Sequence, residues 1–464
     1  MSTQLSPPLW PQGHRLELPL ISKLEQEVLA KHRVSMQADL QARIEAVGAE
    51  IASRKLGCRC TQCGKPMEHK GNKRSHVQTL LGLIGLWRAA FRCADCKQTR
   101  YPLDEALGLE AGFFSPALGR LLALIATLCT FVQGSEIAER LLGIAISPKG
   151  LWKVTQRLGQ AAWKAMNDTA QRYADVRTAP DQPAPENAPD TVLLGTDGCM
   201  LGMQRRSTRR HRTDPSTPLP PLPPLPKEEG EGFRENKTGV ILLPAERTEL
   251  SPGRHSVVRR YLVSCLGTAD EVFNLLWAKL QLLGWLGPNT VVVIVGDGAK
   301  WIWNRAALFA NRCEILDFWH AAEHAWDTAR ILYGAESKKT IEWATAVVDL
   351  LRAGKVDDVI ALLERMKPKR QSRSQQLLCE KAIVDLLEYY TDNRTRMRYD
   401  EYLAKGYGIG SGAIESAHKQ VTHARMRQAG MRWSEAGARR MLALRVLLLN
   451  GEWNVLDGLV AAAA

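Results

Sequence analysis

Residues 405–433 have the sequence KGYGIGSGAIESAHKQVTHARMRQAGMRW, which places one carboxylate at the start of a helix just after a glycine-rich approach. Glycine lifts the steric limits on the backbone, and Ser411 can cap the helix that follows. Glu415 then falls in the first turn, where the helix dipole favours a carboxylate even without a function. Helical spacing predicts a polar face with Glu415, Lys419 and Thr422, and an opposite face with Ile414, Ala417 and Val421.

Two aspartates lie upstream, where apolar and strand-like runs end: Asp197 in DTVLLGTDG and Asp297 in TVVVIVGDG. Three carboxylates are enough to bind two divalent cations, which activate a nucleophile on one side of a phosphodiester and stabilise the leaving oxygen on the other. Oxygen ligands suit Mg²⁺, or Mn²⁺ in its place. The sequence therefore predicts that Asp197, Asp297 and Glu415 converge on a catalytic metal site.

Short apolar or β-branched runs, broken by glycine or charge, predict a five-stranded α/β domain. A helical pattern at 269–284 separates the third run from the fourth, and another helix separates the fourth from the fifth. This succession matches an RNase H-like mixed sheet, in which the first and fourth strands are neighbours. The runs are TVLLGTDG, TGVILLPAE, RRYLVSCLG, TVVVIVGDG and RCEILDFW.

The predicted order of domains follows the changes in composition along the chain. A proline-rich linker and a low-complexity loop rich in arginine and proline cannot bury a core. The ranges are 1–56 (helical), 57–108 (zinc ribbon-like), 109–177 (helical, with a helix-turn-helix), 178–190 (linker), 191–336 (first part of the catalytic core, with the loop 205–232), 337–404 (helical insertion) and 405–464 (second part of the core and carboxy-terminal helices).

Two Cys-x2-Cys pairs, Cys60 with Cys63 and Cys93 with Cys96, resemble a zinc ribbon. Four thiolates close a tetrahedral structural Zn²⁺ site, and each pair presents two sulfurs from one turn. The spacing between the pairs exceeds the commonest zinc spacing, and Cys58 is an alternative ligand. A redox function is the competing interpretation, although the surrounding sequence lacks a thioredoxin-like setting.

The segment SEIAERLLGIAISPKGLWKVTQRLG, residues 135–159, resembles a helix-turn-helix. Ser147 and Pro148 are typical of the N-cap and first residue of its second helix. That helix would direct four polar side chains towards a DNA groove or phosphates, although a plain helical hairpin has the same pattern. These side chains are Lys149, Lys153, Gln156 and Arg157.

The chain of 464 residues has a formal net charge of +13, which favours a polyanionic partner such as DNA or an anionic membrane. A membrane-spanning segment is not expected, because the apolar run 121–132 is shorter than the roughly 20 residues required. The amino terminus does not resemble a secretory signal. We therefore expect a cytoplasmic protein, associated with the nucleoid when bound to DNA, with reduced cysteines.

The segments GDGAKWIWNRAALFANRCEILDFWHAAEHAW and KGYGIGSGAIESAHKQVTHARMRQAGMRW, with TDGCM and FRENKTGV, resemble the DDE insertion-sequence transposases of the Kra-type group, relatives of the Mutator-like transposases. The resemblance runs from the cysteine pairs to LRVLLLNGEW, and the loop 205–232 is longer than that pattern. It implies a DDE triad of Asp197, Asp297 and Glu415. It also implies the Cys-or-Asp-x2-His signature at Asp317 and His320.

The implied activity is metal-dependent DNA cleavage and strand transfer. The implied partners are the terminal inverted repeats of the element, target DNA, and further copies of the chain in a homodimer or higher oligomer. Positively charged residues that follow Glu415 are expected to position DNA, namely Lys419, Arg425 and Arg427.

Two other classes of function remain as alternatives. His320, Glu323 and His324 match H-x-x-E-H, the inverted zincin pattern of metallopeptidases, but this short motif leaves the aspartates, the cysteine pairs and the charge unexplained. A DNA-binding regulator without catalysis would use only the cysteine ribbon and the helix-turn-helix. Loss of a triad carboxylate would favour the regulator, and all three are present.

Overall fold

The computed structural model of the protein describes residues 20–53, 58–109, 114–176, 187–204, 232–251, 254–257, 259–368 and 372–462. Most of the predicted linker 178–190 and of the predicted loop 205–232 lies outside these residues. The chain divides into two units, the first of residues 1–122, 135–146 and 460–464, the second of residues 123–134 and 147–459. In the part of the chain that is described, no helix has the length and apolarity to span a membrane.

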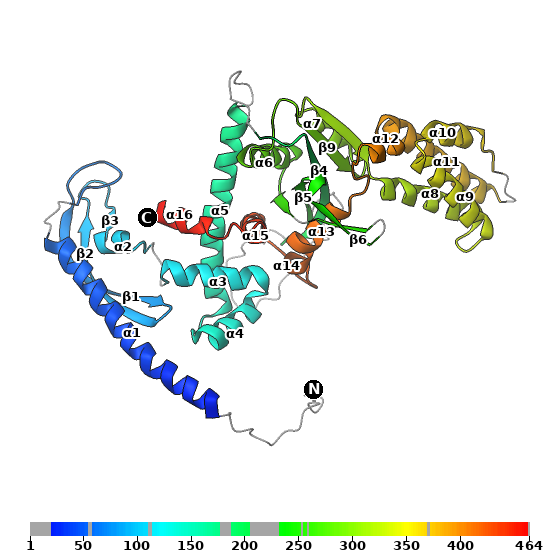
Figure 1. Cartoon of the computed structure of the whole chain (residues 1–464). Helices are drawn as coiled ribbons and strands as arrows, with labels where there is room; N and C mark the ends of the chain where they lie inside the picture. Colours follow the sequence, from blue (N-terminus) through cyan, green and yellow to red (C-terminus); the bar gives the residue numbers. More distant parts are fainter. Residues whose placement is uncertain are drawn as a thin grey trace, which may run out of the picture. The chain divides into compact units, whose positions relative to one another are not determined.

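The first unit joins a long helix to a small antiparallel sheet (Figure 1). The predicted helical range 1–56 forms one helix across its described residues, 20–53, and Gln41 on that helix exchanges two hydrogen bonds with the backbone of Gly85. Ile44, Val77 and Ile84 contribute to the small core between helix and sheet. The elements are α1 (Leu20–Ser53), β1 (Glu68–Thr79), β2 (Gly82–Arg92), β3 (Thr99–Arg100) and α2 (Pro102–Ala106).

A five-stranded mixed sheet is the centre of the second unit, with strand order β10-β9-β4-β5-β8. β4 pairs parallel to β9, which pairs parallel to β10, while β5 is antiparallel to both β4 and β8. All five predicted runs are strands, and the expected contact of the first with the fourth is confirmed. The strands are β4 (Thr191–Gly202), β5 (Phe233–Leu242), β8 (Arg260–Cys265), β9 (Val291–Gly296) and β10 (Arg312–Leu316).

The sequence did not predict the hairpin that lies between β5 and β8. It consists of β6 (Arg247–Ser251) and β7 (Arg254–Val257), which pair with one another in a separate two-stranded sheet after a short 3-10 turn at Pro244–Glu246. The polar sequence of these strands lacks the apolar character by which the other strands were recognised.

Helices cover both faces of the sheet, and glycines in the strands permit their close approach. A Cβ at Gly239 would lie 2.7 Å from Leu276 of α6 (Ala269–Leu282). A Cβ at Gly195 would lie 3.4 Å from Ile414 of α13 (Gly412–His418). Gly195 pairs with Val240, so these two residues point to the same face of the sheet. Gly239 is the residue before Val240 and points to the opposite face, because successive residues of a strand alternate. α6 and α13 therefore lie on opposite faces of the sheet.

The range predicted as a helical insertion, 337–404, contains four helices and a 3-10 turn in its described residues, and helices of this range pack beside α8 after the last strand (Figure 1). Three helices precede the sheet in sequence, namely α3 (Pro116–Leu128), α4 (Phe131–Leu142) and α5 (Pro148–Val176), and α7 (Lys300–Ala306) lies between β9 and β10. The insertion and its neighbour comprise α8 (Phe318–Tyr333), α9 (Lys338–Arg352), α10 (Val356–Arg365), α11 (Arg373–Asn393), a 3-10 turn (Arg394–Arg396) and α12 (Tyr399–Ala404).

Two buried arginines join the carboxy-terminal helices to the last turn of α3. Arg425 donates from Nε to the carbonyl of Ala126 at 2.8 Å, and Arg445 donates from Nη1 to the carbonyl of Thr127 at 3.0 Å. Cations stabilise the exposed carbonyls and the negative dipole of a helix end. The elements that follow α13 are a π-helical turn (Lys419–His423), α14 (Ala424–Met426), α15 (Glu435–Leu449) and α16 (Val455–Ala462).

We expect Arg445→Met to destabilise the protein by about 2–4 kcal/mol, because the carbonyls of Thr127, Val421 and Gln420 would lose their donor in a buried place. Thermal unfolding should show a melting temperature lower by roughly 4–10 °C. Arg365→Met is the matched control, because Arg365 is exposed on α10. Equal melting temperatures of the two variants would show that the buried arginine contributes no stability.

Candidate active site and metal centre

Asp197 and Asp297 lie at the same edge of the sheet, where the parallel pairing of β4 and β9 ends. The last paired residues are Gly195 and Val295, and Asp297 comes directly after β9. Asp197 was expected to end its strand, and this detail is wrong, because β4 continues to Gly202 in antiparallel pairing with β5. Asp197 therefore lies inside the long strand β4, just beyond the point where β4 stops pairing with β9.

Backbone donors orient both carboxylates. Oδ1 of Asp197 accepts from the N–H of Gly198 at 2.6 Å, and Oδ1 of Asp297 accepts from the N–H of Ala299 at 3.0 Å. The carbonyl of Asp297 also accepts from the hydroxyl of Tyr389 at 3.0 Å, a contact supplied by the helical insertion. Carboxylate oxygens keep further lone pairs when they accept one hydrogen bond, so both groups can still bind a cation.

Glu415 reaches this region on α13, which packs on the face of the sheet that carries Gly195. Ile414 is buried against Gly195, while the next side chain, Glu415, is exposed. Because Asp197 is two residues beyond Gly195, it points to the same face. The structure thus brings the helix with the third carboxylate onto the strand that bears the first.

Ser411 stands at the N-cap position of α13, but its hydroxyl does not cap the helix. It donates to Oδ2 of Asp317 instead, and the N–H of Phe318 donates to the carbonyl of Ile409 at 2.9 Å. Asp317 itself caps α8 by accepting from the N–H of Trp319. Burial raises the pKa of this carboxyl group above its ordinary value.

This contact gives Asp317 a structural position that the sequence signature alone did not predict. Asp317 follows β10, and its side chain holds the glycine-rich approach to Glu415 at the same end of the sheet as Asp297. A side chain at Gly410 would collide with Trp319, since the added Cβ would lie 2.9 Å from that ring. Asp317 therefore positions the segment that carries the third carboxylate.

A π-helical turn at Lys419–His423 follows α13 and changes the predicted faces of this helix. Thr422 was expected on the polar face with Glu415, but it is fully buried and accepts from Nδ2 of Asn236 at 2.9 Å. A π turn contains more residues per turn than an α-helix, so the later side chains rotate relative to ideal α-helical spacing. Lys419 remains exposed, as predicted.

The three carboxylates do not form a compact preformed ion site. Among the described residues, one group of three or more His, Cys, Asp or Glu side chains has all its ligand atoms within 4.8 Å of one another, and that group consists of cysteines. Asp197, Asp297 and Glu415 therefore stand further apart than a single ion requires. Their oxygen donors suit Mg²⁺ or Mn²⁺, and a pair of cations bridges wider carboxylate spacings than one ion does.

The H-x-x-E-H motif lies on α8, and the contacts of its two histidines differ from those of zinc ligands. His324 packs against Tyr389 with ring centroids 4.2 Å apart, and burial lowers its pKa. His320 is half exposed, with Nδ1 3.8 Å from a carboxylate oxygen of Glu323. Within the described ranges, no third ligand completes a metal group with these histidines. The peptidase interpretation therefore gains no support.

The side chains expected to contact DNA separate into exposed and buried groups. Lys149, Lys153 and Arg427 are exposed, and Arg157 is partly buried. Gln156 is buried and accepts from Arg440, so the prediction that it faces DNA is wrong. Arg425 is also buried, with its guanidinium 5.1 Å from the Phe131 ring, and cannot meet phosphate. Gln156 and Arg425 are buried by helices distant in sequence, and the spacing of residues along one helix does not reveal such packing.

α5 begins at Pro148, and the hydroxyl of Ser147 accepts from the N–H of Gly150, as the sequence predicted. The helix extends to Val176 and packs against α6 and α15 inside the second unit. It is thus much longer than the expected recognition helix and is part of the core around the sheet. The exposed lysines of its first turns remain the part that can contact DNA.

A buried polar cluster between α13 and the sheet was not predicted from the sequence. It includes His418, whose Nε2 lies 3.5 Å from Oδ2 of Asp197, and Cys199, which lies two residues further along β4. Burial alone would lower the pKa of His418, but the neighbouring Asp197 carboxylate and Cys199 thiol together raise it to about 9. The four-residue spacing from Ile414 to His418 was the available signal, because both must face the sheet.

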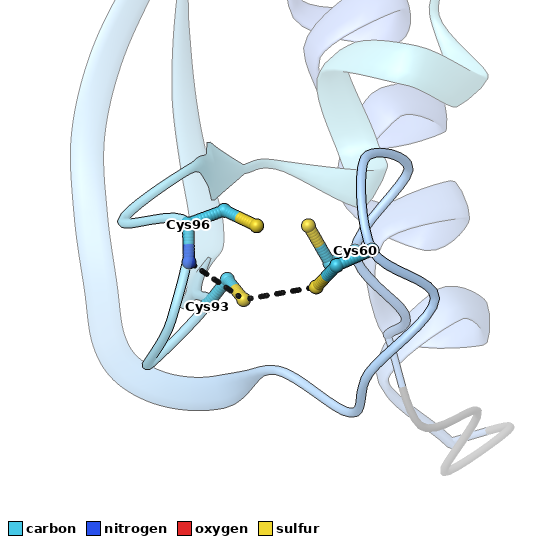
Figure 2. A group of neighbouring side chains, drawn as sticks. Cys60, Cys93 and Cys96 are labelled. Carbon is cyan, nitrogen blue, oxygen red and sulfur yellow. Dashed lines mark hydrogen bonds between the residues drawn. The ribbon is translucent and has the colours of Figure 1, made fainter.

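The four predicted zinc ligands meet in the first unit. The ligand atoms of Cys60, Cys63, Cys93 and Cys96 all lie within 4.8 Å of one another. Figure 2 shows the thiols of Cys60, Cys93 and Cys96 directed into the space between two turns. Cys58, the alternative ligand, is outside this group, and burial raises the pKa of its thiol.

The two cysteine turns have the same backbone form. Gly64 donates to the carbonyl of Cys60 at 2.9 Å, and Lys97 donates to the carbonyl of Cys93 at 3.1 Å. Both donors have positive φ angles, 72° at Gly64 and 57° at Lys97. A left-handed lysine is unfavourable by about 1–2 kcal/mol, so it persists where the surrounding turn is fixed. The repeated turn and the four sulfurs fit a closed tetrahedral Zn²⁺ site.

We expect the purified protein to hold one Zn²⁺ that Cys93→Ser removes, since a serine hydroxyl is a poor replacement for a thiolate ligand. Metal analysis after gel filtration measures the content, and protease digestion should show earlier cleavage between residues 58 and 109. Cys58→Ser is the matched control and should keep its zinc. Full zinc content in Cys93→Ser would contradict the four-cysteine site.

No family model matches this chain. Over 393 residues the chain is 25% identical to the UPF0236 protein in vanSb 3'region of Streptococcus gallolyticus, a match that covers 82% of this chain and 73% of that protein. Among solved structures, the Drosophila P element transposase strand transfer complex is similar with 12% identity and a TM-score of 0.30, covering 75% of this chain and 94% of that one. Both similarities are distant.

Proposed function

We propose that this protein is a DDE-type DNA transposase, which binds the ends of a mobile element and carries out metal-dependent cleavage and strand transfer. One observation carries the proposal: β4, β9 and α13 bring Asp197, Asp297 and Glu415 from distant parts of the sequence to one region of one sheet. A structural role explains an ion pair or a capped helix, but does not require three carboxylates from three elements.

The strand order supports an RNase H-like interpretation of the domain. Three strands run antiparallel in succession, and two more follow in parallel on the other side of the first. In this proposal the catalytic edge lies where the parallel pairing of β4 with β9 ends, and the insertion α9–α12 lies between the fifth strand and the helix with Glu415.

In the proposed reaction, water first attacks the phosphodiester at the element's end and frees a 3′-hydroxyl. That hydroxyl then attacks a phosphodiester of target DNA, so the bond broken in the target is replaced by one to the element. Bound divalent cations would supply nucleophile activation and stabilisation of the leaving oxygen. Asp197, Asp297 and Glu415 would hold these cations, with Gly198 and Ala299 fixing the orientation of the two aspartates.

Exposed, positively charged side chains that follow Glu415 along the chain suit a DNA substrate. Lys419 follows Glu415 by one helical turn, and Arg427 is exposed further along the same segment. A cationic surface beside the reacting phosphates would hold the backbone and neutralise charge without reading sequence. A non-catalytic regulator would need the positively charged side chains but not the three carboxylates. Replacement of the carboxylates therefore distinguishes the two functions.

We expect Glu415→Gln, Asp197→Asn and Asp297→Asn each to reduce Mg²⁺-dependent cleavage and strand transfer at least 1000-fold, because the amide retains shape but not the charge that a metal needs. The assay uses the terminal inverted repeats found beside the gene, and DNA binding and melting temperature should change little. Glu323→Gln is the matched control and should keep near-parental activity. Full strand transfer by Glu415→Gln would overturn the assignment.

We expect end-binding to weaken steeply with salt and to depend on Lys149 and Lys153. Each phosphate contact contributes about one to the slope of log affinity against log salt, so replacing both lysines by alanine should reduce that slope by about two. Fluorescence anisotropy at several salt concentrations measures it. Lys338→Ala combined with Lys339→Ala removes the same charge from exposed α9 positions and should leave the slope nearly parental. Equal slopes for the two pairs would contradict a contact by α5.

A further inference from the structure

The buried side chains of α13 pack in a regular series along β4, on the face of the sheet where Asp197 lies. Ile414 packs against Gly195, and His418 lies against Asp197, so four residues along the helix correspond to two along the strand. Thr422 continues the series and reaches Cys199 through Asn236, which contacts both. The helix therefore presents a buried imidazole to one of the proposed metal ligands.

The π turn maintains this match. Four residues of an α-helix rotate about 40° beyond a full turn, so eight residues would carry a side chain about 80° away from the sheet. The wider turn at Lys419–His423 offsets this drift, and Thr422 remains buried over β5. π turns inserted into helices occur frequently at functional sites.

His418 has no other hydrogen-bond partner in this position. The residue is 4% exposed, and neither of its ring nitrogens makes a hydrogen bond to a side chain or backbone group. A buried polar group without a partner is unfavourable by about 1–3 kcal/mol. Oδ2 of Asp197 at 3.5 Å from Nε2 is the contact that can remove this deficit after a small movement.

We propose that His418 is a positioning residue, whose Nε2–H holds Oδ2 of Asp197 from within the protein while the N–H of Gly198 holds Oδ1. The carboxylate is then fixed between two donors, and the outward lone pair of each oxygen is left for a cation. Ligating carboxylates depend on such outer partners, whose removal lowers metal affinity about 10- to 100-fold. This inference rests on the proposed function, since it assumes that Asp197 binds metal.

The other charged groups around Asp197 do not replace this contact. Glu235 lies beside Gly198 and pairs with Lys237, whose ammonium stands 5.1 Å from the Trp301 ring. Lys419 is exposed on the next residue of the helix after His418. Among the described side chains, His418 is the one that lies within ion-pair distance of the Asp197 carboxylate.

The test compares His418→Leu, His418→Gln and Thr422→Val in the full-length protein. Calorimetric titration with Mn²⁺, without DNA, measures metal affinity, and thermal unfolding with and without Mn²⁺ measures the stabilisation that the ion provides. We expect His418→Leu to bind Mn²⁺ 10- to 100-fold more weakly, and His418→Gln to recover part of the affinity through its amide N–H. Thr422→Val, a buried change in the same cluster, should bind Mn²⁺ normally.

Parental Mn²⁺ affinity in His418→Leu would overturn the inference. If His418→Leu does not fold, the Mn²⁺ affinities of His418→Gln and His418→Asn are compared instead, because only the longer amide reaches Asp197. Equal Mn²⁺ affinities of these two variants would also overturn the inference. Asp197→Asn provides the reference. If Asp197→Asn itself binds Mn²⁺ normally, the proposed metal site fails, whereas loss of binding in Asp197→Asn with normal binding in His418→Leu rejects the role of His418 alone.

Discussion

The segment 409–433 is held at its first end by the start of α8 and at its other end by the end of β4, and the arrangement of the candidate site depends on this constraint. At its start, Ser411 donates to Asp317 and Ile409 accepts from Phe318. At its end, the N–H of Trp433 donates to Gly202 at 2.9 Å, while its carbonyl accepts from Gln204 at 2.8 Å. Between these points α13 has little freedom to slide along β4.

The two fixed ends also explain why so many residues of this segment are buried. Trp433 donates from its ring to the carbonyl of Met426, and Arg425 lies between the Trp433 and Phe131 rings with its Nε on the carbonyl of Ala126. Burial lowers the pKa of Arg425 to about 10, which leaves it charged at neutral pH. The segment therefore combines an exposed side, with Glu415 and Lys419, and an inner side that is held by aromatic rings and buried polar groups.

Much of the fold could be predicted because it depends on local pattern. β-branched runs marked the five strands of the sheet, and Ser147 and Pro148 marked the start of α5. The paired cysteines predicted a group of four sulfurs, since a Cys-x2-Cys turn brings its own thiols together. Asp197 and Asp297 were recognised as neighbours because the order of strands along the chain suggested a familiar sheet.

The features that escaped prediction depend on long-range contacts. Spacing placed Thr422 with Glu415, but the contact with Asn236, 186 residues away, and the π turn place it in the interior. Gln156 and Arg425 carry polar groups typical of DNA contacts, yet Arg440 and Ala126 bind them in the core. The four-residue spacing from Ile414 could have placed His418 on the buried face of the helix, but spacing alone does not identify Asp197 as its neighbour.

Anomalous diffraction from crystals grown with Mn²⁺ and a DNA end would locate the metal ions that the three carboxylates are proposed to share. The ion positions are then observed without reference to activity. We expect Mn²⁺ peaks bounded by Asp197, Asp297 and Glu415, with carboxylate oxygens at about 2.0–2.4 Å, near the range for hard divalent cations. Clear Mn²⁺ peaks elsewhere on the protein, with none touching these three side chains, would contradict the account.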